Sequence, residues 1–320
     1  MIDWHRNTED TMFGTETPEL WVWVEMQTED RLRIKISDDK PRFEVSDLAP
    51  GCHLTVAQVP LSIRGAGRRP DQPRYNVSFT GGPVWGLRVE RAEGGLVLHS
   101  ALPGLIVSDQ FLQLPLRLPP GSALYGWGEN EQDTLQHEPA WRTWGLYSRD
   151  SPPDGATNMY GVHPRLTLLD SEGRAAGILF LNSAAQELAI TPAPGIVYRT
   201  IGGIIDMYIF LGPGPEEVVA QYTAAVGRPP LPPYWALGFH LCRWGYNTLE
   251  KMQAARARTR EAAIPQDAQW GDIDIMERQL DFTVDADRFG GLAAWVEQEK
   301  EVGLRFITIL DPCIRYSVST

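Results

Sequence analysis

Four prolines stand within the eight residues from Arg228 to Trp235, in the segment RPPLPPYW. Proline fixes φ, lacks an amide donor and is not tolerated inside a helix or a central strand, so a stiff extended joint is expected here. The character of the sequence also changes at this point, because short β-type runs precede the segment and a strand–helix alternation follows it. The sequence therefore predicts two domains, residues 1–228 and residues 229–320.

Residues 20 to 210 are predicted to form an antiparallel β-sandwich. Short runs rich in Val, Ile, Leu, Tyr and Trp recur there, separated by Gly, Pro and Asp. Such spacing is typical of two packed antiparallel sheets. The run GPGPEEVVAQYTAAVG then predicts a helix, because Pro215 suits the first turn, two acidic residues follow it at the positive end of the dipole, and Gly227 suits the end.

After the joint, the predicted order is strand, helix, strand, helix, strand. The strands are expected at 235–241, 268–276 and 305–312, and the helices at 248–264 and 291–303. This alternation indicates a parallel sheet covered by helices, either an open doubly wound sheet or the start of a (β/α)8 barrel. The first strand is followed by CRWGYNT and not by the G-x-G-x-x-G of a dinucleotide-binding sheet, which favours the barrel.

Each predicted barrel strand ends in polar or aromatic residues, which is where barrels carry their functional groups. Along the second strand, the pleat would place Asp272 and Asp274 on one side and Ile273 on the other. A buried carboxylate is costly unless it accepts hydrogen bonds, and sugar hydroxyls are suitable donors. The two acids are thus candidate ligands for a sugar.

Simpler interpretations stay open for these residues. Asp274 or Asp281 could pair with Arg243 or Arg278 as a structural ion pair. His240 lies within an apolar strand, where a histidine is more often part of the core than a ligand, so no chemistry is assigned to it. Trp244 follows a strand end and is either a platform for a sugar ring or a packing residue.

Net charge and cysteine content limit the kinds of partner and cofactor that this chain is expected to bind. The formal net charge of −12 disfavours nucleic acid and anionic membranes, so a neutral substrate is expected. Three scattered cysteines suit neither a disulfide framework nor a zinc site, and no metal or cofactor is predicted. The sequence shows no signal peptide and no apolar run of about 18 residues, so no membrane segment is expected. Asn76 begins a glycosylation triplet that matters only in the secretory pathway.

Several segments together resemble glycoside hydrolase family 31, and within it the animal α-glucosidases. The resemblance is dense from about Leu124 to Ile314 and weaker before that. The segments that carry it are LYGWGEN, SRDSPPDGATNMYGVHP, YRTIGGIIDMYIFLGPGPEEVVAQY, RPPLPPYWALGFH, GFHLCRWGY, WGDIDIMERQLDFTVD and ITILDP. The sequence departs from the family pattern at Ile275, where tyrosine is usual, and at Cys313, where a small residue is usual.

The resemblance implies a galactose-mutarotase-like β-sandwich followed by a (β/α)8 barrel that cleaves terminal α-linked glucose with retention. It further implies a set of contacts to a neutral α-glucoside oligosaccharide. By this resemblance, the carboxylates that bind the sugar hydroxyls and the side chains that cover the ring are Asp150, Trp244, Asp272, Ile273 and Ile309. The family also suggests a lysosomal, secretory or cell-surface setting.

The catalytic carboxylates of the family do not occur in these residues. A retaining glycosidase needs a nucleophile and an acid/base, and the family nucleophile lies in a W-x-D-M-N-E segment that this sequence lacks. The predicted barrel residues stop after the third strand, and the final RYSVST departs from the family pattern. Two interpretations therefore stand: the N-terminal portion of an α-glucosidase, inactive by itself, or a non-catalytic carbohydrate-binding or pseudo-enzyme product.

Overall fold

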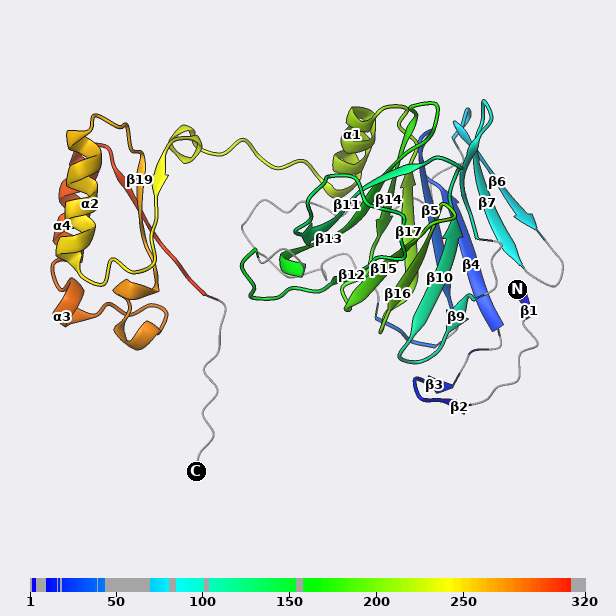
Figure 1. The fold of residues 1–320 in the computed structure, drawn as a ribbon, viewed down its shortest axis with the longest axis horizontal. Helices are drawn as coiled ribbons and strands as arrows, with labels where there is room; N and C mark the ends of the chain where they lie inside the picture. The colour runs from blue at the N-terminus through cyan, green and yellow to red at the C-terminus, as the bar shows by residue number, and fades with distance from the viewer. Residues whose placement is uncertain are drawn as a thin grey trace. The chain divides into compact units, whose positions relative to one another are not determined.

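The computed structural model describes residues 2–3, 10–15, 17, 19–38, 40–43, 70–80, 85–100, 104–153 and 158–311. The chain divides into two compact units, Met1–Arg228 and Pro229–Thr320 (Figure 1). Each unit has a hydrophobic core of its own. The predicted departure at Cys313 and the segment RYSVST lie outside the described residues.

The N-terminal unit contains two large antiparallel sheets, which confirms the predicted sandwich. The order in the seven-stranded sheet is β1 (Ile2–Asp3), β4 (Glu19–Met26), β5 (Arg31–Ser37), β17 (Ile205–Phe210), β14 (Ala175–Phe180), β13 (Asn158–Leu169) and β11 (Ala123–Asn130). The order in the eight-stranded sheet is β12 (Thr143–Leu146), β15 (Gln186–Thr191), β16 (Gly195–Thr200), β10 (Leu112–Arg117), β8 (Leu96–His99), β7 (Gly86–Arg91) and β6 (Tyr75–Thr80), with β9 (Ile106–Val107) paired to β10. A small hairpin joins β2 (Asp10–Thr11) and β3 (Gly14–Thr15).

The core of this unit lies between the two sheets. On β5 every second residue is buried, and Leu32 and Ile34 are fully so, as expected for a strand with one face inward. Trp127 of the first sheet packs edge-on against Tyr198 of the second, with ring centroids 6.2 Å apart. Burying a side chain of Leu size contributes about 1.5–3 kcal/mol, so the buried residues between the sheets stabilise the sandwich.

Helix α1 (Pro215–Val226) confirms the helix predicted after the last sandwich strand. Its N-terminus is held by Glu217, whose Oε2 accepts the backbone N–H of Gly214 at 3.1 Å. Val218 is fully buried and faces Gly177 on β14, where an added Cβ would lie 2.6 Å from Val218 Cγ1. The missing side chain at Gly177 therefore allows the helix to approach the sheet closely.

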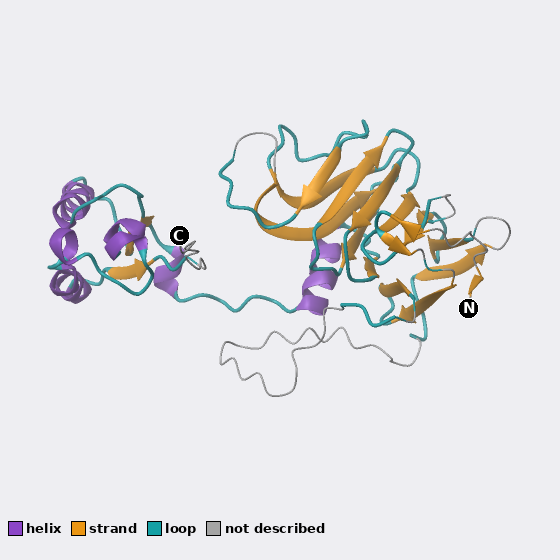
Figure 2. Cartoon of the chain, turned by 90° about the horizontal axis from the view of Figure 1, so that it is seen from below, coloured by secondary structure: helices purple, strands orange, loops and turns teal. Residues whose placement is uncertain are grey.

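The C-terminal unit has the predicted parallel β–α–β–α–β order. Its sheet runs β18 (His240–Leu241), β19 (Ala268–Gly271), β20 (Arg305–Thr308), and β18 and β20 each pair with β19 in parallel. Helices α2 (Leu249–Glu261) and α4 (Leu292–Glu301) lie on one side of these strands (Figure 2). The shorter helical segments are η1 (Tyr234–Leu237), η2 (Ile273–Ile275), η3 (Glu277–Gln279) and α3 (Ala286–Phe289).

Two predicted strands are shorter than expected. The first was predicted over 235–241, but its beginning forms the helical turn η1 and only His240–Leu241 pair. The second was predicted over 268–276, but β19 ends at Gly271 and the chain turns into η2. β19 ends there because Asp272 begins the turn η2: its Oδ1 accepts the N–H of Ile273 at 2.7 Å, and its carbonyl accepts the N–H of Ile275 at 3.1 Å. The predicted pleat at Asp272 and Asp274 is therefore wrong.

Candidate functional site

Asp272 is the first residue after β19 and begins the helical turn η2. Its Oδ1 accepts the backbone N–H of Ile273 at 2.7 Å, which caps the turn. Its Oδ2 faces the thiol of Cys242, with Sγ 3.8 Å away. The side chain is half-buried, so the carboxylate keeps acceptor capacity on a partly exposed surface.

Asp274 is buried in the same turn but is not part of an ion pair among the described residues. Its Oδ2 accepts the backbone N–H of Gly245 at 2.6 Å. Arg278 instead pairs with Glu277 at 3.4 Å, and Asp281 Oδ1 accepts the N–H of Asp311 at 3.3 Å. The suggested pairing of Asp274 or Asp281 with arginine is therefore wrong, because among the described residues both carboxylates accept backbone N–H groups and neither forms an ion pair.

Trp244 lies in the loop that joins β18 to α2, and 68% of its surface is exposed. An exposed indole at a strand end offers a flat apolar face to a ligand. Ile273 and Ile309 are half-buried and pack against the same hydrophobic cluster of this unit. The structure thus places Trp244, Asp272, Ile273 and Ile309 on segments that follow the carboxyl ends of three neighbouring parallel strands.

Cys242 is a neighbour of Asp272 that the sequence did not predict. Burial raises the pKa of its thiol, and the negative charge and hydrogen bond of Asp272 raise it further, with a smaller contribution from Asp274. In this arrangement the thiol is a donor to Asp272 Oδ2. The signal available in the sequence was its position one residue after a barrel strand.

His240 has both ring nitrogens occupied. The indole N–H of Trp270 donates to Nδ1 at 3.1 Å, which leaves the proton of a neutral ring on Nε2, and Nε2 lies 3.2 Å from the carbonyl oxygen of Trp235. The rings of Trp235 and His240 also stack, with centroids 5.8 Å apart. His240 is therefore bound through both ring nitrogens by residues of its own unit.

Asp150 belongs to the N-terminal unit, where it is exposed in the segment between β12 and β13. Hydrogen bonds to the start of β13 hold this segment: the N–H of Arg149 donates to the carbonyl of Met159 at 3.2 Å, and Ser148 Oγ donates to the carbonyl of Tyr160 at 2.9 Å. The Asp150 carboxylate is thus presented to solvent from a tethered backbone.

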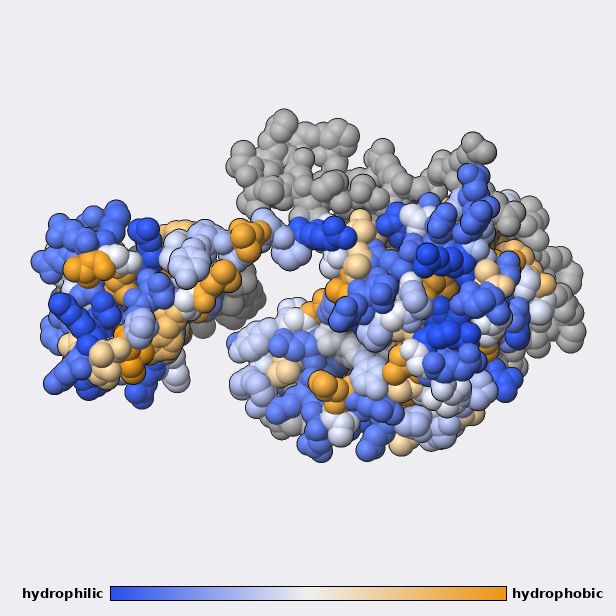
Figure 3. Space-filling view, turned by 90° about the horizontal axis from the view of Figure 1, so that it is seen from above, coloured by the Kyte–Doolittle hydropathy of each residue, from blue (hydrophilic) through white to orange (hydrophobic). Residues whose placement is uncertain are grey.

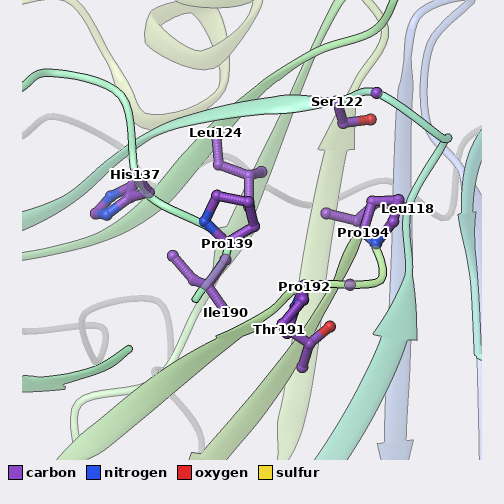
Figure 4. Close-up of a pocket in the computed structure, with 11 residues that line it drawn as sticks. Leu118, Ser122, Leu124, His137, Pro139, Ile190, Thr191, Pro192 and Pro194 are labelled. Carbon is purple, nitrogen blue, oxygen red and sulfur yellow. The ribbon is translucent and has the colours of Figure 1, made fainter. Parts of the chain in front are cut away.

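The sandwich also contains two cavities that none of the five predicted site residues lines. The smaller, of about 110 Å³, is walled by Leu, Pro and Ile side chains, with Ser122 and Thr191 at opposite edges and His137 at one side (Figure 4). Burial lowers the pKa of His137, although Nε2 lies 2.6 Å from the carbonyl oxygen of Gly126. The larger, of about 640 Å³, is lined by residues that include Tyr147, His163 and Tyr222.

The described residues contain no cluster of His, Cys, Asp and Glu with metal-binding geometry. Within the same residues, no helix combines the length and the apolar character that crossing a bilayer requires. In the view of Figure 3, hydrophobic residues occur singly or in small groups among hydrophilic ones.

A β-sandwich followed by parallel β–α–β–α–β, with carboxylates just beyond a strand end, defines the class of multi-domain protein in which a sandwich precedes the start of a (β/α)8 barrel. Residues 229–320 match the glycosyl hydrolases family 31 TIM-barrel domain. The chain is 41% identical to intestinal sucrase-isomaltase of Rattus norvegicus over 297 residues, 92% of this chain, and 38% identical to lysosomal α-glucosidase of Mus musculus over 309 residues, 96% of this chain. The chain belongs to glycoside hydrolase family 31, and the lysosomal α-glucosidase is among the members that it resembles.

The solved structures agree with the fold. A family 31 dextranase from Flavobacterium johnsoniae, complexed with isomaltotriose, superposes with a TM-score of 0.70 at 19% identity, over 91% of this chain and 36% of that one. The chain spans 15% of the length of the sucrase-isomaltase and 31% of that of the lysosomal enzyme. The described parallel strands thus correspond to the first part of the family's barrel.

Proposed function

We propose that this chain supplies sugar-contacting residues of a retaining α-glucosidase, which removes terminal α-linked glucose from maltose and from fragments of starch or glycogen. The observation that carries the proposal is the identity of 38–41% to α-glucosidases over more than nine-tenths of the chain. The net charge of −12 supports a neutral substrate.

The geometry after the barrel strands supports specific roles. Asp272 already accepts two donors and keeps lone pairs for sugar hydroxyls, because a carboxylate has about four acceptor sites. The exposed indole of Trp244 offers an apolar surface for a ring, and Ile273 and Ile309 offer smaller ones. Asp150 is proposed as a further acceptor, supplied by the sandwich.

We further propose that the 320 residues do not hydrolyse α-glucosides by themselves. Retention requires two carboxylates about 5–5.5 Å apart across the scissile bond, one of them a nucleophile. The W-x-D-M-N-E segment that carries the nucleophile in the family is absent from this sequence. The same absence supports the second candidate, a non-catalytic protein that binds carbohydrate.

The test compares the 320-residue chain with a longer chain that contains these residues and the W-x-D-M-N-E segment. Release of the chromophore from a chromogenic α-glucoside is expected from the longer chain only, and maltose is expected to inhibit it competitively. Turnover by the 320 residues above a buffer blank would overturn the proposed inactivity. A longer chain that binds maltose and leaves it intact would support the non-catalytic candidate.

A further inference from the structure

The buried carboxylate of Asp274 holds the loop that carries Trp244. Asp274 is 8% exposed, and its Oδ2 accepts the backbone N–H of Gly245 at 2.6 Å. A carboxylate removed from water requires strong donors, and a charge-assisted bond to a backbone amide is one. With no ion pair to Asp274 among the described residues, this amide is the donor that compensates for the burial.

The bond acts directly on the backbone of Trp244. The N–H of Gly245 belongs to the peptide that joins the two residues, so the bond fixes the plane of that peptide. Gly245 has φ +104°, a left-handed value that favours glycine, and nothing lies within 4 Å of the position of an added Cβ. Asn247 Nδ2 donates to the Gly245 carbonyl at 3.0 Å, so both polar groups of this glycine are bound.

The turn η2 contacts the loop on both sides of Trp244. Before Trp244, Cys242 Sγ lies 3.8 Å from Asp272 Oδ2. After Trp244, the N–H of Gly245 donates to Asp274 Oδ2. Asp272 and Asp274 are two residues apart in one short turn. The turn η2 therefore holds the backbone on both sides of Trp244 and carries the half-buried carboxylate of Asp272.

We propose that Asp274 is a positioning residue, which fixes Trp244 relative to Asp272 and thereby sets the affinity for the sugar without touching it. The positioning follows from the contacts alone, whereas the effect on sugar affinity rests on the proposed function. A purely structural carboxylate would change stability and leave the loop and the affinity as they are. Hydrogen exchange and enzyme kinetics distinguish the positioning role from the purely structural one.

The first experiment measures hydrogen exchange of the backbone amides in the 320-residue chain. Asp274→Ala is expected to speed exchange at Gly245 at least tenfold, because the amide loses its acceptor, while amides of β19 and β20 keep their rates. Asp274→Asn retains an acceptor oxygen and is expected to give a smaller change. The matched control is Asp267→Ala, since Asp267 Oδ2 accepts the N–H of Phe239 at 3.1 Å, before the start of β18.

The second experiment uses an active longer chain that contains these residues. Asp274→Ala is expected to raise KM for maltose about fivefold with kcat changed less than twofold, which corresponds to about 1 kcal/mol of binding. Asp274→Asn is expected to fall between the wild type and the alanine variant. Asp267→Ala is expected to lower Tm without changing KM.

The outcomes separate the positioning claim from the proposed function. Unchanged exchange at Gly245 in Asp274→Ala would overturn the inference, whatever the enzyme does. Faster exchange at Gly245 in a chain whose longer form has no affinity for maltose would keep the positioning claim and remove the proposed function. Should the alanine variant unfold, Asp274→Asn decides: lower Tm with normal Gly245 exchange and normal KM would leave Asp274 a structural residue only.

Discussion

Arg42 forms a bidentate ion pair with Asp38 in the N-terminal unit: Nε donates to Oδ1 at 2.6 Å and Nη2 to Oδ2 at 2.7 Å. Thr17 Oγ1 also donates to Oδ2, at 2.9 Å. Both partners of the pair are buried, with side-chain exposures of 8% and 0%. Burial by itself would raise the pKa of Asp38, but the bonds from Arg42 and Thr17 outweigh it and hold that pKa below its ordinary value.

The lowered pKa of Asp38 makes the sandwich sensitive to acid. The ionised Asp38 carboxylate contributes fully to the free energy of unfolding above its pKa in the unfolded chain, about 3.9. The contribution is lost as the pH falls from there through the lower pKa of the folded state. Arg42→Ala leaves a buried carboxylate unpaired and is expected to lower the free energy of unfolding by about 3–5 kcal/mol at neutral pH. Urea denaturation at neutral pH and at about pH 3 measures both effects.

The control for that prediction is Lys40→Ala. Lys40 pairs with Asp109 at 2.9 Å, but both side chains are nearly half exposed. Exposed pairs contribute about 0–1 kcal/mol, so the variant is expected to stay close to the wild type. Equal losses for Lys40→Ala and Arg42→Ala would contradict the role given to burial.

Gly177→Ala is expected to destabilise the docking of α1 on β14. The added methyl group would meet Val218 Cγ1 at 2.6 Å, and crowding of a packed core costs about 1–3 kcal/mol. Val218→Ala removes the colliding atom, so the double variant should be less destabilised than the sum of the two single ones. Strict additivity in urea denaturation would show that the two residues do not meet.

Asp272→Ala is expected to reduce kcat/KM of an active longer chain far more than Asp274→Ala. A hydrogen bond to a charged acceptor is worth about 1.5–3 kcal/mol, which is roughly a 10- to 150-fold loss. Asp281→Ala is the control, because that carboxylate binds only the N–H of Asp311 among the described residues. The reverse order of the first two variants would assign the sugar contact to Asp274.

Asp150→Ala is expected to lower the same kcat/KM, although Asp150 belongs to the N-terminal unit. The expected loss is of the same order as for a single charged hydrogen bond, about 1.5–3 kcal/mol. Asp133, another exposed acid of that unit, provides the control variant Asp133→Ala. Identical kinetics for the two variants would remove Asp150 from the site.

Limited proteolysis is expected to cut first beyond Arg228. The joint from Pro229 to Pro233 is exposed and lies outside the regular elements, and in the described sheet of the C-terminal unit β18 and β20 are edge strands. The sandwich buries its own core, so a resistant fragment of residues 1–228 should accumulate. Earlier digestion of the sandwich, seen by mass spectrometry, would contradict this order of stability.

The sequence predicted strands and helices well where their pattern depends on local chemistry. The β-type run LRIKI predicted the strand that is β5, and Pro215 and Gly227 bounded α1 to within a residue. The end of β19 was missed because the alternation of DIDIM also suits a strand, whereas in the structure Asp272 caps the helical turn η2. The wrong pleat at Asp274 follows from the same turn.

The candidate site was predicted in part. Residue types and their place after strand ends identified Asp272 and Trp244, and the resemblance to family 31 added Asp150, Ile273 and Ile309. The partners of the two acids could not be predicted, because Cys242 and Gly245 lie some thirty residues away in the chain and reach the turn only through strand pairing. A pattern in one segment does not specify which amide of another segment it will meet.

The shortness of β18 has a consequence for ligand binding. Only two residue pairs join His240 and Leu241 to β19, so little sheet pairing restrains the loop that follows. The entropy of that loop is therefore reduced mainly by its few bonds to η2, before any ligand arrives. A loop that is ordered before the ligand arrives loses less conformational entropy on binding. A sugar that makes few contacts then binds more tightly, because its binding energy is not spent on ordering the loop.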